Sequence, residues 1–377
     1  MTDRFFLRET AEPVLPAPRS TVGAAGWLRA NLFFSGWGAL VTVIAVALAV
    51  AIFVPLLDWA IVEAHWTGAT RAACLDADGK KAFGACWAFI EVRFPTLIYG
   101  FYPVDERWRV DLFALLTIAA LVLPSFLKGL GRIWGVRFVA LAILFPLGWV
   151  LLHGGVMGLP LVETSKWGGL MLTLIIAGSG MICSFPLGIL LALGRRSELP
   201  VIRTVSIAFI EIVRGVPMVT VLFMASVMLP LFLPNGVTID KLMRAIVGVS
   251  LFTAAYVAEV MRGGLQAIPK GQYEAAAAIG LGYWRQMRLV ILPQAMQIVI
   301  PGIINTYIGL LKDTTLVAVI GLVDLIGIIA AATADPAWLG FATEGYVFVG
   351  LLFWVFCFAM SRYGLRLEDT LAKATRR

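Results

Sequence analysis

Long apolar runs constrain this chain more than any other feature of its sequence. Several of them exceed the roughly 18 residues that predict a membrane-spanning helix, in a chain of 377 residues that is 60% hydrophobic and 14% charged. Soluble domains do not have this composition, and a transmembrane β-barrel would instead show alternating segments of about ten residues. The sequence therefore predicts an all-α polytopic membrane protein.

We expect about eight transmembrane helices in three regions. Residues 1–33 are predicted to form a cytoplasmic tail, residues 34–160 to form three additional spans with an external loop at 58–111, and residues 161–377 to form a unit of five spans. The predicted spans lie near residues 34–57, 112–128, 138–152, 168–193, 204–233, 243–260, 293–311 and 344–361.

The basic residues indicate how the chain is oriented. The formal net charge is +7, and most of the 30 Lys and Arg residues fall in segments that are cytoplasmic if the N-terminus is inside. This distribution follows the positive-inside rule, so we expect both termini to be cytoplasmic. It explains the positive charge as a topology signal, and we expect no nucleic-acid partner.

The four cysteines do not form a metal-binding set, and we expect no metal site. Cys183 and Cys357 lie in apolar spans, where a small buried thiol is usual. Cys74 and Cys86 both lie in the predicted external loop. A disulfide between them is possible if that face is oxidising, and the sequence leaves this open.

The apolar stretch 314–333 allows two interpretations. It could be another crossing, but that would move the basic C-terminal tail to the external side. Irregular backbone at membrane depth is tolerated only where it faces protein or a wet cavity. We therefore favour a broken or re-entrant segment with a substrate path beside it, while the spanning alternative stays open.

The segment 262–292 is a polar and basic loop between two predicted spans. The alanines at 275–278 favour a helix, and Gly280 is well placed to end that helix in a left-handed conformation. Pro293 costs little in the first turn of the next span, because its missing donor has no helical partner there. Taken alone, these residues also fit an ordinary solvated loop.

The spacing within this loop is more specific. Glu274-Ala275-Ala276 is followed after three residues by Gly280 and, nine residues later, by the run from Val290 to Pro293. This run resembles the EAA loop of bacterial ABC-importer permeases, whose pattern is Glu-Ala-Ala, three residues, Gly, nine residues, Ile-x-Leu-Pro. Val290 in place of Ile is the one difference.

Three flanking segments are similar to permeases for polar amino acids, the histidine/glutamine permease family. They are the run from Ala255 to Gln272, the Glu211-x-x-Arg214-Gly215-x-Pro217 segment, and Leu310 to Leu316, in which Thr315 replaces Ser. The resemblance covers about residues 167–377. An N-terminal addition such as 34–160 resembles the longer subfamily of general L-amino-acid and glutamate/glutamine/aspartate permeases.

The resemblance implies a transmembrane permease subunit of an ABC importer for polar L-amino acids in the bacterial inner membrane, with a five-helix type I permease core. It implies that residues 274–280 form a coupling helix in a groove of a separate ATPase subunit. The residues it assigns to ATPase coupling are Glu274, Ala275, Ala276, Gly280, Leu292 and Pro293.

The resemblance also implies partners for this chain. They are a second permease subunit that is related but different, two ATPase subunits, a periplasmic amino-acid-binding protein and the lipid bilayer. Because the chain contains no GxxxxGK[ST] phosphate loop, we expect no cofactor in it and no enzymatic activity. ATP and Mg would be bound by the ATPase.

Charged residues in apolar stretches are further candidates, since a charge near the bilayer centre costs at least about 2.5–3.5 kcal/mol. Glu211 and Arg214 are three apart on one helix and can pair, which would either fix packing or line a path. The Lys312-Asp313 pair could complement the carboxylate and ammonium of an amino acid, or could be a bridge that holds the break in shape. The predicted substrate-path residues are Asn305, Thr306, Lys312, Asp313, Thr314, Glu211 and Arg214.

Three other functions compete with a permease subunit. An ion-coupled secondary transporter would show an internal inverted repeat, which is not apparent. A membrane enzyme would need a clustered nucleophile, metal set or carboxylate pair, and a purely structural subunit would not transport. The sequence leaves open which amino acids are carried, whether the second permease is identical, and what residues 34–160 add.

Overall fold

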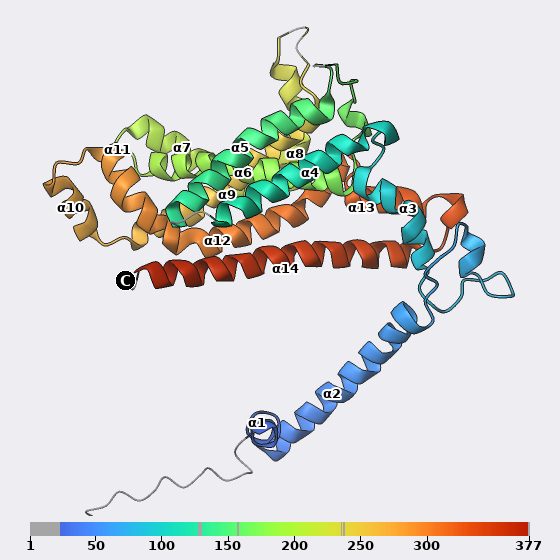
Figure 1. The fold of residues 1–377 in the computed structure, drawn as a ribbon. Coiled ribbons are helices and arrows are strands. Elements are labelled where there is room, and N and C mark those ends of the chain that lie inside the picture. The colour runs from blue at the N-terminus through green and yellow to red at the C-terminus, as the bar shows by residue number, and fades with distance from the viewer. Residues whose placement is uncertain (1–22, 127–129, 157, 235, 237, 376–377) are drawn as a thin grey trace, which may run out of the picture. The chain divides into compact units, whose positions relative to one another are not determined.

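The computed structural model of the chain describes residues 23–126, 130–156, 158–234, 236 and 238–375 (Figure 1). The regular elements over these residues are helices, so the all-α fold class is confirmed. Most of the predicted cytoplasmic tail, residues 1–22, lies outside the described residues.

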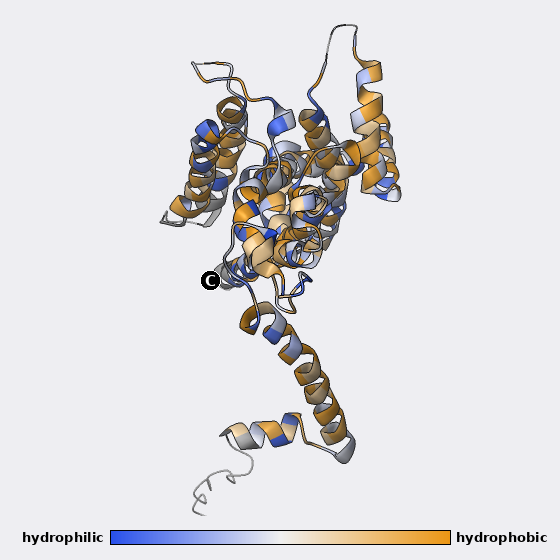
Figure 2. Cartoon of the chain, turned by 90° about the vertical axis from the view of Figure 1, so that its right-hand side faces the viewer, coloured by the Kyte–Doolittle hydropathy of each residue, from blue (hydrophilic) through white to orange (hydrophobic). Residues whose placement is uncertain are grey.

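The chain divides into two compact units, of which the first comprises residues 1–65 and 74–85. It contains α1 (Gly23–Asn31), α2 (Gly36–Leu57) and a π-helical turn (Asp58–Val62). The side chain of Ser35 caps α2 by accepting a hydrogen bond from the backbone N–H of Gly38. None of the residues of α2 is buried within the chain, and Figure 2 shows that most of them are hydrophobic. This helix is therefore suited to a lipid environment.

The second unit comprises residues 66–73 and 86–377. Its helices are α3 (Trp87–Tyr99), α4 (Arg107–Val122), α5 (Leu130–His153), α6 (Gly169–Arg195), α7 (Pro200–Gly215), α8 (Met218–Phe223), α9 (Lys241–Ala267), α10 (Lys270–Ala278), α11 (Tyr283–Gln286), α12 (Leu292–Asp313), α13 (Leu325–Thr333) and α14 (Ala342–Thr375). Helices α6 and α9 form its centre, α12 packs on α9, and α14 packs on α12.

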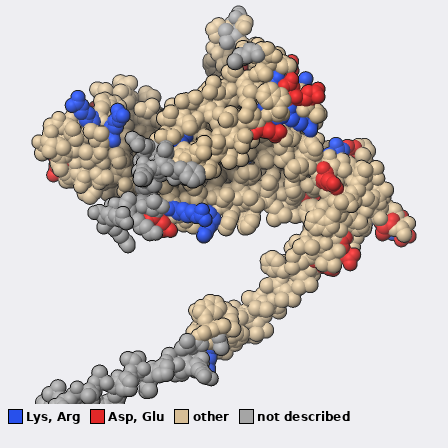
Figure 3. All heavy atoms as spheres, viewed as in Figure 1, with Lys and Arg blue, Asp and Glu red and all other residues tan. Residues whose placement is uncertain are grey.

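Six helices in the described residues are long and apolar enough to cross a membrane. They are Gly36–Val62, Gly135–His153, Gly169–Arg195, Lys241–Ala267, Tyr283–Ile320 and Ala342–Asp369. A seventh span is obtained if α7 and the segment Met218–Phe232 count as one, although they meet at 110°. On the face shown in Figure 3, charged side chains gather near the ends of the second unit, as expected for a protein with an apolar middle.

Two predicted spans differ from these helices. The span predicted at 204–233 is broken, because Pro217 forces Val216 into an extended conformation. The span predicted at 112–128 corresponds to α4, which begins with charged residues at Arg107, Arg109 and Asp111 and has only 16 residues. Residues 127–129 lie outside the described residues.

The segment after α12 is broken, as the sequence analysis favoured. A 3-10 helix (Thr314–Ile320) follows α12, and then comes α13, which has nine residues. A helix of that length spans about 14 Å, too short for a hydrocarbon core of about 30 Å. Helix α13 packs against α3, α6 and α14, so its backbone lies against protein. It lies at the opposite end of the second unit from α10 and the chain's C-terminus (Figure 1).

The cysteines fall into two classes. Cys74 and Cys86 are both disulfide-bonded, which settles the alternative that the sequence left open. Cys183 and Cys357 carry free thiols.

Candidate functional site

The alanine-rich helix predicted in the loop between two spans is α10. It begins after Pro269 and ends where Gly280 adopts a left-handed conformation with φ +79°. The N–H of Gly280 donates to the carbonyl of Ala277 (2.9 Å) and the N–H of Leu281 donates to the carbonyl of Ala276 (3.2 Å). These two bonds define a Schellman motif, so the prediction that Gly280 terminates the helix is confirmed.

The chain then runs without a break into a membrane helix. Helix α11 is followed by a π-helical turn (Met287–Ile291) directly before Leu292 and Pro293, which lie in the first turn of α12. A wide turn beside a proline is a common way to accommodate its ring and missing donor. Because Tyr283–Ile320 qualifies as one span of 38 residues, a displacement of α11 can be transmitted directly to α12.

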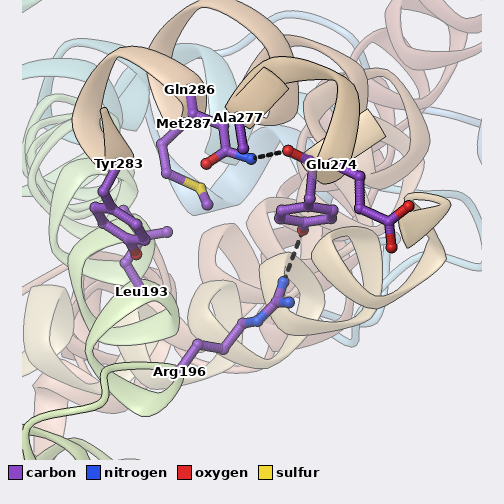
Figure 4. Close-up of a pocket in the computed structure, with 8 residues that line it drawn as sticks. Leu193, Arg196, Glu274, Ala277, Tyr283, Gln286 and Met287 are labelled. Carbon is purple, nitrogen blue, oxygen red and sulfur yellow. Dashed lines mark hydrogen bonds between the residues drawn. The ribbon is translucent and has the colours of Figure 1, made fainter. Parts of the chain in front are cut away.

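Helix α10 is braced against the ends of α6 and α9. Arg196, which caps the C-terminus of α6, donates to the hydroxyl of Tyr273 (2.9 Å) and to the carbonyl of Leu265 (3.1 Å). The Tyr273 hydroxyl also donates to the Leu265 carbonyl (3.1 Å). Gln286 of α11 donates to the backbone carbonyl of Tyr273 (2.7 Å), as Figure 4 shows. The loop is therefore a fixed element and not a mobile linker.

A shallow cavity of about 390 Å³ lies beneath α10 and α11. Glu274 lines it but is exposed, and its carboxylate points away from Arg196 and Gln286 in Figure 4. Among the described residues, Glu274 forms no hydrogen bond or ion pair. The cavity is lined by Leu193, Arg196, Tyr273, Glu274, Ala277, Tyr283, Gln286 and Met287.

The loop that carries Glu274 exposes apolar side chains beside its charged ones, which include Lys270, Arg285 and Arg288. Ile279, Trp284 and Leu289 are 74%, 67% and 62% exposed, and the small side chains of α10 allow a close approach. A carboxylate among exposed apolar side chains, on a rigid support, has the chemistry of a protein-binding surface. Of the predicted coupling residues, Glu274, Ala275, Gly280 and Pro293 are exposed, Leu292 is half-buried and Ala276 is buried.

A second group of predicted residues belongs to a charged cluster on α6, α7 and α9. Glu259 is its centre, because the guanidinium groups of Arg195 (3.6 Å), Arg214 (3.5 Å) and Arg262 all contact its carboxylate. Arg195 also pairs with Glu211 (2.8 Å). A carboxylate that is shared by three helices holds these helices at one relative position.

The prediction that Glu211 and Arg214 pair with each other is wrong. In the part of the chain that the structure describes, Glu211 pairs with Arg195 of α6, and Arg214 pairs with Glu259 of α9. The reason is that α7 packs against both α6 and α9, which bring partners of opposite charge. Arg195 and Arg196 are consecutive, so the end of α6 holds both the charged cluster and the loop.

The other predicted path residues lie in the last turns of α12 and at Thr314, where the helix continues as the 3-10 turns Thr314–Ile320 without the break predicted at Lys312. Asn305 and Lys312 are exposed and Asp313 is half-buried. The hydroxyl of Thr306 donates to the carbonyl of Gly302 (2.9 Å), and that of the buried Thr314 donates to the carbonyl of Leu311 (2.7 Å). Within the described ranges, Lys312 and Asp313 form no ion pair with each other. The geometry therefore does not support a Lys–Asp bridge at the break.

Sequence reasoning missed the bracing residues. The predicted site residues did not include four of these side chains, which are Arg195, Arg196, Arg262 and Tyr273. Two consecutive arginines at the end of an apolar run are nevertheless a visible signal of a membrane boundary. Their partners come from other helices, which a pattern along one segment does not reveal. The described residues contain no group of three His, Cys, Asp or Glu side chains that could hold a metal.

Residues 184–371 match the family described as "Binding-protein-dependent transport system inner membrane component". The chain is 53% identical over 359 residues to the inner membrane amino-acid ABC transporter permease protein YhdY of Escherichia coli (strain K12), covering 95% of this chain and 96% of the relative. It is 39% identical over 432 residues to the glutamate/glutamine/aspartate/asparagine transport system permease protein BztC of Rhodobacter capsulatus, covering 99% of each.

A solved structure is also similar in part. The crystal structure of an amino acid ABC transporter with histidines matches 54% of this chain and 92% of its own chain, with 29% sequence identity and a TM-score of 0.47.

Proposed function

The chain belongs to the family of amino-acid ABC transporter permeases, and on this premise we propose that it moves polar L-amino acids across the bacterial inner membrane. The energy comes from ATP hydrolysis in a separate subunit. The chain itself is a multi-pass membrane subunit that provides the path.

One observation carries the proposed mechanism: the loop between α9 and α12 is hydrogen-bonded to its neighbouring helices and is continuous with α12. Its helix is closed by the Schellman motif at Gly280, braced through Tyr273 to α6 and α9, and continuous through α11 with α12. An ATPase subunit that grips the surface around Glu274 can therefore move α12 as it binds and hydrolyses ATP. We assign this surface to the exposed members of the predicted coupling set, which are Glu274, Ala275, Gly280 and Pro293.

The exposed polar face of α12 is the proposed substrate path. Asn305 and Lys312 are seven residues apart on one helical face, both exposed within a membrane span. A polar and charged face is costly against lipid, so it should face water or another protein. We assign it to a path shared with a second permease subunit, in which the Lys312 ammonium attracts the substrate carboxylate.

The other predicted path residues have different parts in this proposal. Asp313 lies beside Lys312 at the end of α12, and we assign it to the substrate ammonium. The hydroxyls of Thr306 and Thr314 both donate to backbone carbonyls of α12, which shapes the helix near the path. Glu211 and Arg214 lie in the charged cluster at the α10 end, where they form the inner mouth of the path.

We propose the following assembly. A second permease subunit that is related but different faces α12, two ATPase subunits bind the α10 loops and hold ATP and Mg, and a periplasmic binding protein delivers the amino acid. Because ATP is cytoplasmic, the end that carries α10 and the C-terminus of α14 should face the cytoplasm. We propose the same side for the N-terminus on the distribution of basic residues in the sequence.

Reconstitution tests this function. The chain, its candidate second permease, ATPase and binding protein are placed in liposomes, and uptake of labelled amino acids is measured with and without enclosed ATP. We expect ATP-dependent uptake that unlabelled polar amino acids reduce by competition. Glu274→Ala should lower it, whereas Glu198→Gln, an exposed charge between α6 and α7, should not. Uptake driven by an ion gradient without the ATPase contradicts the proposal.

A further inference from the structure

Helix α3 lies outside the segment that matches the permease family, yet it packs against helices of that segment. The segment that matches the family begins at residue 184, far beyond α3, and the sequence of α3 predicts part of an external loop. Its 13 residues span about 20 Å, too little to cross a bilayer. Helix α3 nevertheless packs against α6, α13 and α14, at the end of the unit away from α10 (Figure 1).

One set of contacts joins α3 to the turn between α13 and α14. Phe89 is fully buried, with its ring centroid 5.6 Å from that of Trp338 in this turn. Arg93 forms an ion pair with Asp335. The Phe94 ring lies edge-on to Phe348 of α14 at 6.4 Å. Aromatic and ionic contacts therefore fix this turn and the beginning of α14 to α3.

A second set of contacts joins α3 to the start of α6. Gly100, which ends α3, forms a β-bridge with Trp167, and a Cβ on Gly169 would lie 2.3 Å from the carbonyl oxygen of Leu97. This approach is possible only with glycine. Gly169 also bridges to Asp324, the residue that caps α13. The start of α6 thus holds the beginning of α13, and α3 holds its far end.

These contacts are important because α13 belongs to the broken segment that follows α12. A short helix between irregular stretches has few backbone partners of its own and depends on its neighbours for a fixed position. The N-terminal extension supplies one of these neighbours. Both relatives that match over nearly the full length also span this extension.

We propose that α3 is an outer brace, which fixes the turn between α13 and α14 to the start of α6 so that these parts move as one rigid body during transport. Rearrangement then takes place in the other helices, including the bent α7–α8 pair and the α10 end. The movement as one rigid body rests on the proposed transport function. The rigidity of the contacts between α3, the turn and α6 can be tested without transport.

Hydrogen exchange measures the rigidity directly. Phe89→Ala in the full chain should accelerate exchange of the amides at 335–341, where the Trp338 N–H donates to the Asp335 carbonyl (2.9 Å), by more than about tenfold. Glu91→Gln, an exposed position on the same helix, is the matched control and should change nothing. If Phe89→Ala leaves exchange at 335–341 as in the wild type, α3 is not a brace.

Cross-linking tests the one-body movement. Cys183→Ser and Cys357→Ala remove the free thiols, and Arg93→Cys with Asp335→Cys is then joined by a short bis-maleimide. Uptake by the reconstituted complex should differ less than about twofold between cross-linked protein and protein reacted with a monofunctional maleimide. A loss of more than about tenfold on cross-linking alone overturns the brace. Absence of uptake from every sample counts against the proposed function, while the exchange result stands by itself.

Discussion

Replacing Gly280 by alanine should loosen the end of α10 without creating a clash. A Cβ at this position would meet no atom within 4 Å, but the backbone has φ +79°. The cost is therefore that of a left-handed conformation, about 1–2 kcal/mol for an L-residue. This corresponds to a shift of roughly 5–30-fold toward the opened state of the Schellman turn.

Hydrogen exchange on the purified complex measures this shift. The amide of Leu281, which donates to the carbonyl of Ala276 at 3.2 Å, should exchange roughly 5–30 times faster in Gly280→Ala. Gly280→Asn should lie between this variant and the wild type, because asparagine tolerates the left-handed region. ATP-driven uptake should fall in the same order.

Gly282→Ala is the matched control. Gly282 has an ordinary φ of −67° and also has open space at its Cβ position, so this variant should exchange and transport as the wild type does. The reasoning is refuted if both alanine variants behave alike, or if Gly280→Ala keeps wild-type exchange at Leu281.

Three further predictions concern the charged groups. Glu259→Gln should destabilise the chain by about 1.5–3 kcal/mol, because three arginines lose their shared carboxylate; thermal unfolding should show this loss, and Glu198→Gln should not reproduce it. Lys312→Met should leave the complex assembled but lower amino-acid uptake about tenfold, whereas uptake at the wild-type rate would remove this side chain from the path. The backbone N–H of Ala337, and after it the Arg93 side chain, hold the pKa of Asp335 below its usual value. The contribution of the ionised Asp335 to stability is therefore complete above about pH 4 and is lost as the pH falls through the lowered pKa. The protection factor of the amides at 335–341, which corrects exchange for its intrinsic pH dependence, should therefore fall on acidification more in the wild type than in Asp335→Asn. An equal fall in the two proteins would contradict this.

Features set by local sequence were predicted well. Apolar runs identified the long spans, because twenty or so consecutive apolar residues have few alternatives to a membrane helix. Gly280 was identified as a helix terminator because its role depends on backbone conformation alone. The break after α12 followed from charge balance, and α13 is indeed too short to span.

Features set by tertiary contacts were not predicted. Helix α3 was placed in a loop, because its 13 residues are too few for a span signal and its buried face is completed by α6, α13 and α14. The pairing of Glu211 with Arg214 was preferred because they are neighbours on one helix, but Arg195 and Glu259 on adjoining helices compete for them. Sequence spacing identifies neighbours along a helix and not those across helices.

The account depends most on α10 acting as the lever of an ATP-driven transporter. The direct measurement is ATP hydrolysis and amino-acid uptake by the reconstituted complex in which residues 270–280 are replaced by a Gly-Ser segment of equal length, with the rest of the chain unchanged. We predict that uptake is abolished and that hydrolysis no longer responds to the loaded binding protein. Uptake at the wild-type rate through a permease with this flexible loop would contradict the account.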